Sequence, residues 1–417
     1  MTTVSSAPTA VGIIAEYNPF HLGHEYHIRR AKELSGAPYC IVIMSGDFVQ
    51  RGEPAMFHKY LRTQMALKGG ADLVIEMPSL FAVSSAEDFA SCGVSLLQQL
   101  GVTSHLCFGS ESGDLNLLKS VAQVLAKEPA DYAVTLKEKL KEGMTFPEAR
   151  VQALLAVMPE TQDLSALLSS PNNILGIEYL KAMERFHSTL KPVTITRQGQ
   201  GYHDPSLDGP MASASALRQA LLREGGSLDA IRSQIPPVLI PEYKNGRPVS
   251  AFHFSALLNY TLLRHFYQGE SLSYFADWTP EMEHRMENQL LCYGSWEERV
   301  NQLKTKNITY TRASRALLHL VLGHRKETVE HFRQTGYAPY SRILGFRQTA
   351  LPLLSRIKTC ADIPLVTKIA DAKNLLPPDA YELLSGDLYG SHIYQSVFCQ
   401  QYHQAPKNEY TQPITIY

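Results

Sequence analysis

The chain has 417 residues, enough for two domains that each bury a core of their own. Hydrophobic residues make up 44% and charged residues 19%, a balance that excludes a disordered or fibrous protein. The formal net charge is −1, and no apolar run approaches the roughly 18 residues that cross a bilayer, so we expect no membrane partner.

The N-terminus and the cysteines indicate the compartment. No basic segment followed by a long apolar one opens the chain, so we expect no signal peptide and a cytoplasmic protein. The six cysteines never form Cys-x-x-Cys, which argues against a disulfide framework or a thiolate zinc site. Buried, reduced thiols are the prediction.

The first two hundred residues alternate between short apolar segments and helical patterns. Strands are predicted at 11–17, 40–46, 72–77, 104–111 and 192–199, and helical patterns at 24–34, 58–70, 84–101 and 115–158. Uninterrupted apolarity is typical of strands covered on both faces, as in a parallel sheet. Strands separated by helices therefore predict a doubly wound, Rossmann-like α/β fold.

Helical patterns such as 250–267 and 312–323 dominate the second half. Prolines and glycines interrupt the periodicity between 225 and 247, as at a domain boundary. We predict a Rossmann-like domain over 1–225 and a mainly helical domain over 226–417.

Residues 17–28, YNPFHLGHEYHI, follow the first predicted strand. A helix is predicted to begin near His21 or Leu22, with Asn18 as a capping residue and Pro19 at an early helical position. Positions three apart share a helix face, so His21, His24 and His27 form one stripe. Two of them lie in the first turn, where unpaired N–H groups and the helix dipole attract anions.

Three interpretations of this stripe compete. Metal binding has the right residue type, but the spacing is neither H-E-x-x-H nor H-x-x-E-H and no carboxylate has an obvious ligand role, so no metal site is predicted. A stripe of core histidines is the structural alternative. Phosphate binding is favoured, because Gly23 lets a ligand approach the backbone and open α/β sheets bind ligands at the carboxyl ends of their strands.

Positive charge gathers late in the chain. Between residues 299 and 358 there are twelve lysines and arginines and only two acids. Such segregation indicates contact with a polyanion, although a solvated basic surface without a partner is the alternative.

The segment His21-Leu22-Gly23-His24 resembles the H-x-G-H signature of the nucleotidyltransferase superfamily, which includes class I aminoacyl-tRNA synthetases. ASASALRQALL (212–222) is similar to a second phosphate motif of these folds, with Ser213 and Ser215 at a helix start and Arg218 one turn in. Taken alone, it is equally an ordinary serine cap with a surface arginine.

A narrower resemblance spans residues 11 to about 350. The segments EYNPFHLGHEYHI, MSGDFVQRGEPA, GADLVIEMP, FGSES, PNNILGIEYLKAM, ITRQGQGYHD and SRILGFR together resemble the bacterial tRNA(Met) cytidine acetate ligase family. Two positions depart from the pattern, Asp47 where asparagine is expected and Ser215 where threonine is expected.

The resemblance implies an ATP-dependent ligase. Acetate would displace pyrophosphate from ATP, and the acetyl group of the resulting acetyl-adenylate would pass to N4 of the wobble cytidine of elongator tRNA(Met). His21 and His24 would be catalytic, with ATP as substrate and Mg²⁺ as its companion. The implied ATP-binding residues are Ile14, Ala15, Glu16, Tyr17, Asn18, Pro19, Phe20, His21, Leu22, Gly23, His24, Glu25, Tyr26, His27, Gly109, Asn172, Asn173, Arg197, Ser215 and Arg218.

Several of these residues also have a purely structural explanation. Gly109 is equally a plain turn, Asn172 or Asn173 a helix cap, and Arg197 a surface arginine. Which of the two asparagines contacts ATP stays open.

The basic region then has a partner, because arginines and lysines interleaved with Tyr310, Tyr340 and Phe346 suit phosphates and unpaired bases. The predicted tRNA-binding residues are Lys304, Lys306, Arg312, Arg315, Arg342 and Arg347.

Two other classes of function stay open, a small-molecule adenylyltransferase and a non-catalytic RNA-binding protein. The sequence leaves open the preferred carboxylate, the metal, the tRNA bases and the oligomeric state.

Overall fold

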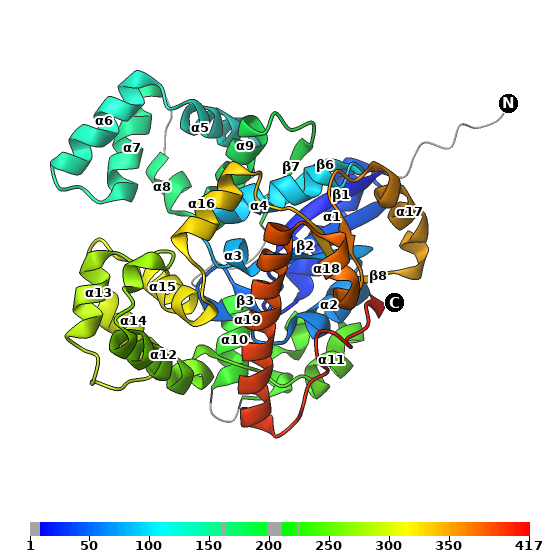
Figure 1. The fold of residues 1–417 in the computed structure, drawn as a ribbon. Helices are drawn as coiled ribbons and strands as arrows, with labels where there is room; N and C mark the ends of the chain where they lie inside the picture. The colour runs from blue at the N-terminus through cyan, green and yellow to red at the C-terminus, as the bar shows by residue number, and fades with distance from the viewer. Residues whose placement is uncertain (1–8, 160–163, 198–210, 224–225) are drawn as a thin grey trace.

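A twisted sheet forms the centre of the molecule (Figure 1). The computed structural model describes residues 9–159, 164–197, 211–223 and 226–417. The sheet strands are β1 (Ala10–Ala15), β2 (Tyr39–Ser45), β5 (Leu73–Met77), β6 (Thr103–Ser110), β7 (Lys191–Thr196), β8 (Ser341–Phe346), β9 (Leu365–Val366) and β10 (Thr415–Ile416). Their order is β10-β8-β5-β2-β1-β6-β7, with β9 beside β8.

The five strands from the first half of the chain confirm the predicted fold class. Neighbouring strands among β5, β2, β1, β6 and β7 are parallel to each other. In chain order these are the third, second, first, fourth and fifth strands of the first half. The order reverses at β1, which lies between β2 and β6, and such a switch point is where open α/β sheets bind ligands. Residues 198–199 of the last predicted strand, and the rest of its motif as far as residue 204, lie outside the described residues.

Helices cover both faces of the sheet (Figure 1). Val11 and Ile13 point to the face covered by α1 (Leu22–Ser35), α2 (Lys59–Lys68) and α10 (Ala214–Leu222). Ala10 and Ile14 point to the other, covered by α4 (Ala86–Gln99), α5 (Leu115–Lys127) and α9 (Pro171–Arg185). Alternation of this kind follows from the two-residue period of a strand, and it explains the continuous apolar pattern.

The long helical pattern at 115–158 is three helices. α5 is followed by α6 (Ala130–Lys141) and α7 (Phe146–Val157). Pro129 precedes α6, and Gly143, between α6 and α7, has φ +86°, a conformation that favours glycine. With α8 (Leu164–Ser169) these helices form a lobe beside the sheet (Figure 1).

Helices dominate the second half, as predicted. They are η1 (Leu228–Gln234), η2 (Pro237–Leu239), α11 (Ile240–Asn245), η3 (Ala251–Phe254), α12 (Ser255–Gln268), η4 (Leu272–Tyr274), α13 (Pro280–Glu287), α14 (Trp296–Leu303), α15 (Tyr310–Leu322), α16 (Lys326–Gln334), η5 (Gln348–Ala350), α17 (Leu351–Cys360), η6 (Ile369–Asp371), α18 (Ala372–Leu375) and α19 (Pro378–Tyr402). A separate core around Phe254, Trp278 and Trp296 holds α12 to α15 together. Over the described ranges, no helix has the length and apolarity to cross a membrane.

The second half also contributes to the sheet. β8 pairs antiparallel with β5, and both β9 and β10 pair with β8. The sequence does not predict these strands, because SRILGF is short and its arginine fits a basic RNA-binding segment. The boundary near residue 225 stays a prediction, since the chain after residue 340 returns to the sheet of the first half.

A buried ion cluster holds that returning chain in place. Lys59 Nζ lies 2.9 Å from Glu76 Oε1 and 3.1 Å from Glu409 Oε2. Arg342 binds the same two carboxylates, at 2.8 Å from Glu76 and 2.5 Å from Glu409. All four side chains are at most 4% exposed, so each charge depends on its partners to offset the cost of burial.

We expect Glu409→Gln to lower the free energy of unfolding by about 3 kcal/mol at neutral pH, because Lys59 and Arg342 would lose a shared buried partner. Burial raises the pKa of Glu409, but Lys59 and Arg342 outweigh burial and lower it to about 2. A depressed pKa gives stability that is present above the unfolded value, about 4.3, and is lost as the pH falls toward 2.

Urea unfolding of wild type and variant across this pH range measures the difference. The variant should lose less stability on acidification than wild type does. Glu382→Gln, an exposed change on α19, is the control. Equal stability of Glu409→Gln and wild type at neutral pH would contradict the role given to the cluster.

Candidate functional site

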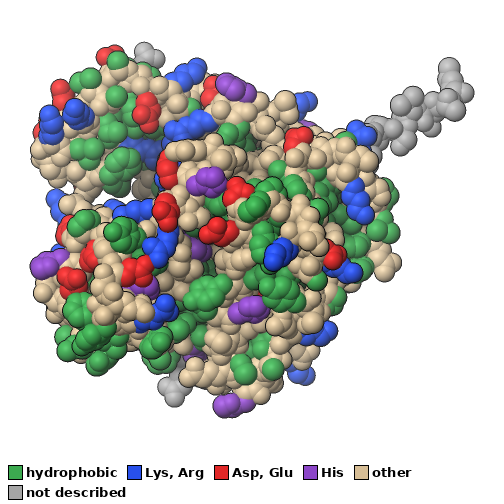
Figure 2. Space-filling model, in the orientation of Figure 1, with side chains coloured by type: hydrophobic (Ala, Val, Ile, Leu, Met, Phe, Trp, Pro, Cys, Tyr) green, Lys and Arg blue, Asp and Glu red, His purple; other side chains and the backbone are tan. Residues whose placement is uncertain are grey.

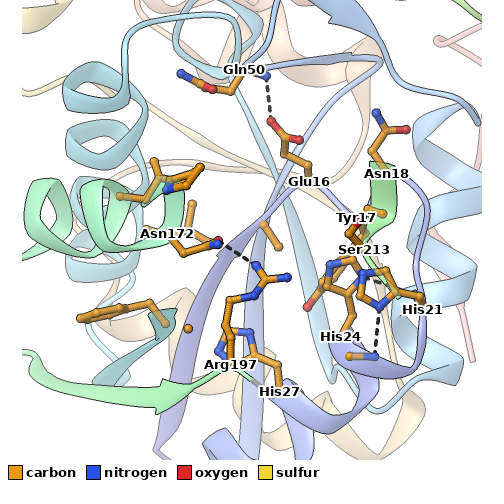
Figure 3. Close-up of a pocket in the computed structure, with 18 of the residues that line it drawn as sticks. Glu16, Tyr17, Asn18, His21, His24, His27, Gln50, Asn172, Arg197 and Ser213 are labelled. Atoms are coloured by element: carbon orange, nitrogen blue, oxygen red, sulfur yellow. Dashed lines mark hydrogen bonds between the residues drawn. The ribbon is translucent and has the colours of Figure 1, made fainter. Parts of the chain in front are cut away.

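A cavity of about 390 Å³ opens beside the switch point, at the carboxyl ends of β1, β6 and β7. The side chains at its polar end come from the start of α1 and from the turns around it (Figure 3). Its lining includes Ile14, Ala15, Glu16, Tyr17, Asn18, His21, Gly23, His24, Tyr26, His27, Gln50, Arg51, Ala86, Phe89, Phe108, Gly109, Asn172, Tyr179, Arg197, Ser213 and Arg218. The cavity thus gathers most of the residues singled out from the sequence.

His21 is the N-cap of α1. Its backbone is extended, and its Nδ1 accepts a hydrogen bond from Gly23 N at 3.0 Å. His24 Nδ1 in turn accepts one from His21 N at 3.3 Å. Two orphan N–H groups of the helix start are therefore satisfied by imidazoles, in a capping box built from two histidines.

These bonds determine which ring nitrogen carries the proton. Because Nδ1 of both His21 and His24 is an acceptor, each neutral ring is protonated at Nε2. The two ring centroids are 3.8 Å apart, so two charged rings would repel each other strongly. The pair therefore offers two N–H donors without a net charge.

Burial and the neighbouring guanidinium groups keep this stripe neutral. Burial, followed by Arg197 and Arg218, lowers the pKa of His21 to about 3. Burial and the neighbouring His21 lower the pKa of His24 well below its usual range. Burial and Arg197 lower the pKa of His27 to about 4. The sequence could not show whether the histidines carry charge; in this structure all three are neutral at pH 7.

The turn before α1 differs from the prediction at Asn18 and Pro19, because α1 begins at Leu22 with His21 as its cap. Asn18 is not the helix cap, because its Oδ1 accepts a hydrogen bond from Met56 N at 2.7 Å and ties the turn to another loop. A Cβ on Gly23 would lie 2.8 Å from His21 Cε1, so the missing side chain makes room for the His21 ring as well as for a ligand.

Arg218 is held against the start of the first helix from α10. Its Nη1 donates to Asn18 O at 2.7 Å and its Nη2 to Ser215 Oγ at 3.0 Å. Ser213 caps α10 by accepting a hydrogen bond from Ala216 N. Ser215 thus positions the guanidinium of Arg218, and Ser213, rather than Ser215, lines the cavity.

Arg197 is held at the end of β7 by a chain of polar contacts. Its Nη1 donates to Asn172 Oδ1 at 2.8 Å, and Asn172 Nδ2 donates to Glu111 Oε1 at 2.6 Å. Glu111 also accepts from Asn173 N at 2.8 Å, while Asn173 Oδ1 accepts from Glu111 N and Ser112 N. The two asparagines therefore differ, since Asn172 lines the cavity and Asn173 is buried as a clamp beneath it.

Some predicted ligands lie behind the cavity wall rather than on it. The predicted residues that are absent from the lining are Pro19, Phe20, Leu22, Glu25, Asn173 and Ser215. Conversely, Gln50, Arg51, Phe89, Phe108 and Tyr179 line the cavity but were not predicted as ligands. Gln50 and Arg51 lie in MSGDFVQRGEPA, one of the segments that carried the resemblance, and this was the available signal. Phe108 and Tyr179 also lie in such segments, FGSES and PNNILGIEYLKAM, whereas Phe89 lies in none of them.

The hairpin strands β3 (Phe48–Val49) and β4 (Glu53–Pro54) connect the cavity to the helical half. Gln50 and Arg51 lie between the two strands, and Ser314 Oγ on α15 donates to Gly52 O at 2.8 Å. A Cβ on Gly52 would lie 2.3 Å from Arg315 N, so α15 packs directly on this loop. The start of α15 therefore borders the rim of the cavity.

The six basic residues predicted to bind tRNA separate into two groups. Lys304 and Lys306 are exposed, and Arg312 is half-buried with no side-chain partner among the described residues. Arg315 pairs with Asp277 at 2.7 Å, and Arg347 donates to Leu67 O and lies over the ring of Tyr417. Only the first group is available to a partner without breaking an internal contact.

The structure contradicts the predicted role of Arg342 in tRNA binding. It is 3% exposed and binds Glu76 and Glu409 in the buried cluster, so it is not available to RNA. Tyr340, predicted to stack on bases, is 1% exposed and donates to Asp387. Both residues belong to the strand region that the sequence analysis had not predicted.

No group of three or more histidines, cysteines, aspartates or glutamates within the described ranges could hold a metal ion. The histidine stripe instead faces Arg197 and Arg218, whose positive charges disfavour a cation. An anion fits this end of the cavity, because two imidazole N–H donors, two guanidinium groups and a helix N-terminus converge there.

Comparisons with known proteins agree with this geometry. Residues 9–409 match the model of the HIGH Nucleotidyl Transferase family. The tRNA(Met) cytidine acetate ligase of Acetivibrio thermocellus is 37% identical over 97% of this chain and 99% of its own length. The Halothermothrix orenii protein of the same name is 38% identical over 91% of this chain and 94% of its own length.

Solved structures show a similarity to the same group of proteins. Thermotoga maritima TmcAL in its apo form superimposes with a TM-score of 0.90 at 31% identity, covering 98% of this chain and 99% of the other. TmcAL bound with alpha-thio ATP superimposes with a TM-score of 0.88 at 30% identity over the same shares. The chain therefore belongs to the HIGH nucleotidyl transferase family and, within it, to the tRNA(Met) cytidine acetate ligases.

Proposed function

We propose that this chain is an ATP-dependent ligase that activates acetate as acetyl-adenylate. It then transfers the acetyl group to N4 of the wobble cytidine of elongator tRNA(Met), forming N4-acetylcytidine and releasing AMP. It works in the cytoplasm, where it meets tRNA. The observation that carries this proposal is the convergence of His21, His24, Arg197 and Arg218 on one cavity at the switch point.

In the first step, acetate attacks the α-phosphate of ATP. His21 and His24 donate from Nε2 to the phosphates, and Arg218, held by Asn18 O, neutralises the charge that builds up as pyrophosphate leaves. Donors that are already fixed by Gly23 N and His21 N need not reorganise during the reaction. The chain thus contributes orientation and charge rather than a covalent intermediate.

The adenosine half of ATP is assigned to the part of the cavity that lies away from the histidines. Gly109 on β6 and Asn172 on α9 both line the cavity. Arg197 lies between Asn172 and the pair His21 and His24 (Figure 3). A Cβ on Gly109 would lie 3.3 Å from Arg197 Cγ, so the glycine also leaves room for that side chain. Glu111 acts through Asn172 and fixes which end of its amide faces Arg197.

Mg²⁺ is proposed as the companion of the phosphates rather than as a protein-held ion. The described side chains form no ligand group for it, so the triphosphate oxygens and water would hold it. It would supply further neutralisation of phosphate charge.

The tRNA is assigned to the basic face next to the cavity rim. Lys304 and Lys306 precede α15 and Arg312 lies in its first turn, close to the loop that carries Gln50 and Arg51. Figure 2 shows Lys and Arg side chains along a hollow between the lobe of α6–α7 and the lobe of α13–α15. A single-stranded anticodon loop reaching across this hollow brings its cytidine to the cavity without opening a duplex.

A small-molecule adenylyltransferase would use the same phosphate-holding groups. It would leave the basic face beside the rim without a role, and the curated relatives carry the ligase name. The ligase is therefore favoured.

We expect His21→Ala and His24→Ala each to slow acetate-dependent exchange of labelled pyrophosphate into ATP by about 100-fold, because each removes a preorganised donor to the phosphates. His284→Ala, an exposed change on α13, is the control. Full exchange activity in a folded double variant would contradict the roles given to both histidines.

We expect the triple change Lys304→Ala, Lys306→Ala and Arg312→Ala to weaken tRNA binding and reduce its salt dependence, because fewer counterions are released from the phosphates. About 10-fold weaker binding at moderate salt, with pyrophosphate exchange unchanged, is the expected result. Filter binding across a salt series measures both effects.

Arg356→Ala and Lys358→Ala on α17, which lies away from α15 in Figure 1, provide the matched control. If the triple variant and this control have the same salt slope, the RNA does not lie on the face assigned to it.

A further inference from the structure

One carboxylate lines the cavity amid its positive charges. Within the described lining, Glu16 is the only acid, whereas Arg51, Arg197 and Arg218 are all present. Both substrates of the proposed first step, ATP and acetate, are anions, so a carboxylate beside them opposes their binding. This unfavourable charge indicates that Glu16 serves a different step.

Glu16 is held in a fixed position. Its Oε1 accepts a hydrogen bond from Gln50 N at 2.9 Å, and its backbone oxygen accepts one from Arg62 Nη1 at 2.6 Å. Arg62 is fully buried and also donates to Phe57 O. Gln50 N is the one hydrogen-bond donor to the Glu16 carboxylate among the described residues, so Oε2 stays available to a ligand.

Glu16 lies apart from the phosphate-holding groups. Figure 3 shows Glu16 and Gln50 at one end of the site, whereas His24, His27 and Arg197 lie together at the other. A triphosphate held at the start of α1 therefore leaves the region around Glu16 free for the second substrate.

Aromatic side chains line the cavity on the α4 and α9 side. Phe89 comes from α4, Tyr179 from α9 and Phe108 from β6, and all three line the cavity. The Phe108 and Tyr179 ring centroids are 5.8 Å apart. Gln50 Nε2 donates to Ser84 O, just before α4, so this wall and the Glu16 loop are joined. Phe108 and Tyr179 share the β6 and α9 walls with Gly109 and Asn172, which are assigned to adenosine. Phe89 on α4 is therefore the aromatic surface that is left for an unstacked base.

We infer that Glu16 recognises the exocyclic amine of the target cytidine and takes its proton during acetyl transfer. This inference rests on the proposed function and adds a residue to its second step. A carboxylate is the partner that accepts a hydrogen bond from cytosine N4, whereas uracil presents an oxygen at the same place and is repelled.

The N4 lone pair forms a bond to the acetyl carbon, and the bond from that carbon to the adenylate oxygen breaks. The electron pair of the broken bond leaves with AMP, and one N4 proton passes to Glu16 Oε2. A fixed base within hydrogen-bond reach favours this transfer, because the amine loses its proton as the amide forms.

The test separates the two steps with Glu16→Gln. The amide keeps an oxygen that can accept from Gln50 N, but it cannot take a proton and it presents a donor to the amine. We expect transfer of the acetyl group from added acetyl-adenylate to tRNA, measured in a single turnover, to fall about 100-fold or more, because this step needs the base but not ATP. A thermal unfolding midpoint equal to that of wild type shows that the variant is folded. Glu33→Gln, exposed on α1, is the control for both assays.

A binding assay tests recognition independently of chemistry. Wild type should bind an anticodon hairpin with cytidine at the target position about 10-fold more tightly than the same hairpin with uridine. Glu16→Gln should lose that preference, because an amide donates to uridine O4.

Two outcomes would overturn the inference. Unchanged transfer, or an unchanged preference for cytidine, would remove the role in the second step. Absence of acetate-dependent exchange in wild type would instead contradict the proposed function itself.

Discussion

Two hydrogen bonds at the start of α1, from Gly23 N to His21 and from His21 N to His24, hold the site together. They use the orphan N–H groups of a helix start, and they direct the remaining N–H of each imidazole away from the backbone. Burial and nearby arginines keep both rings neutral, so the cavity offers donors in a fixed geometry without two adjacent positive charges. The charge that meets phosphate comes from the arginines, which are themselves fixed by Asn18 and Asn172.

Segments from the second half of the chain complete this site, which is built mainly from the first half, in two ways. β8 and the buried contacts of Arg342 and Glu409 fix the returning chain against β5 and α2. The start of α15 packs on the loop that carries Gln50 and Arg51, so the wall of the cavity and the basic face assigned to tRNA are parts of one rigid contact. In the proposed function, adenylate formation and acceptor binding therefore meet at one cavity.

The central five strands, their helices and the histidine stripe could be predicted from sequence, because apolar runs and three-residue spacing are local patterns. Prediction from local patterns failed for residues whose contacts come from distant parts of the chain. Arg342 looked like part of an RNA-binding segment, since nothing near it in sequence shows that Glu76 and Glu409 neutralise it. Asn18 looked like a cap, but Met56 N takes its side chain. Phe89 had no signal, because its place in the cavity depends on how α4 packs. The segment that contains Tyr179 carried the resemblance but did not show which of its residues face the cavity.

The central claim is that His21 and His24 are neutral and protonated at Nε2. Long-range ¹H–¹⁵N spectra of histidine-labelled protein, recorded from about pH 5 to about pH 8 with and without ATP, test it most directly. The account predicts that both rings stay in the Nε2–H form across this range and that their Nε2 signals shift when ATP binds. A proton on Nδ1, or titration of either ring near pH 6.5 in the free protein, would contradict it.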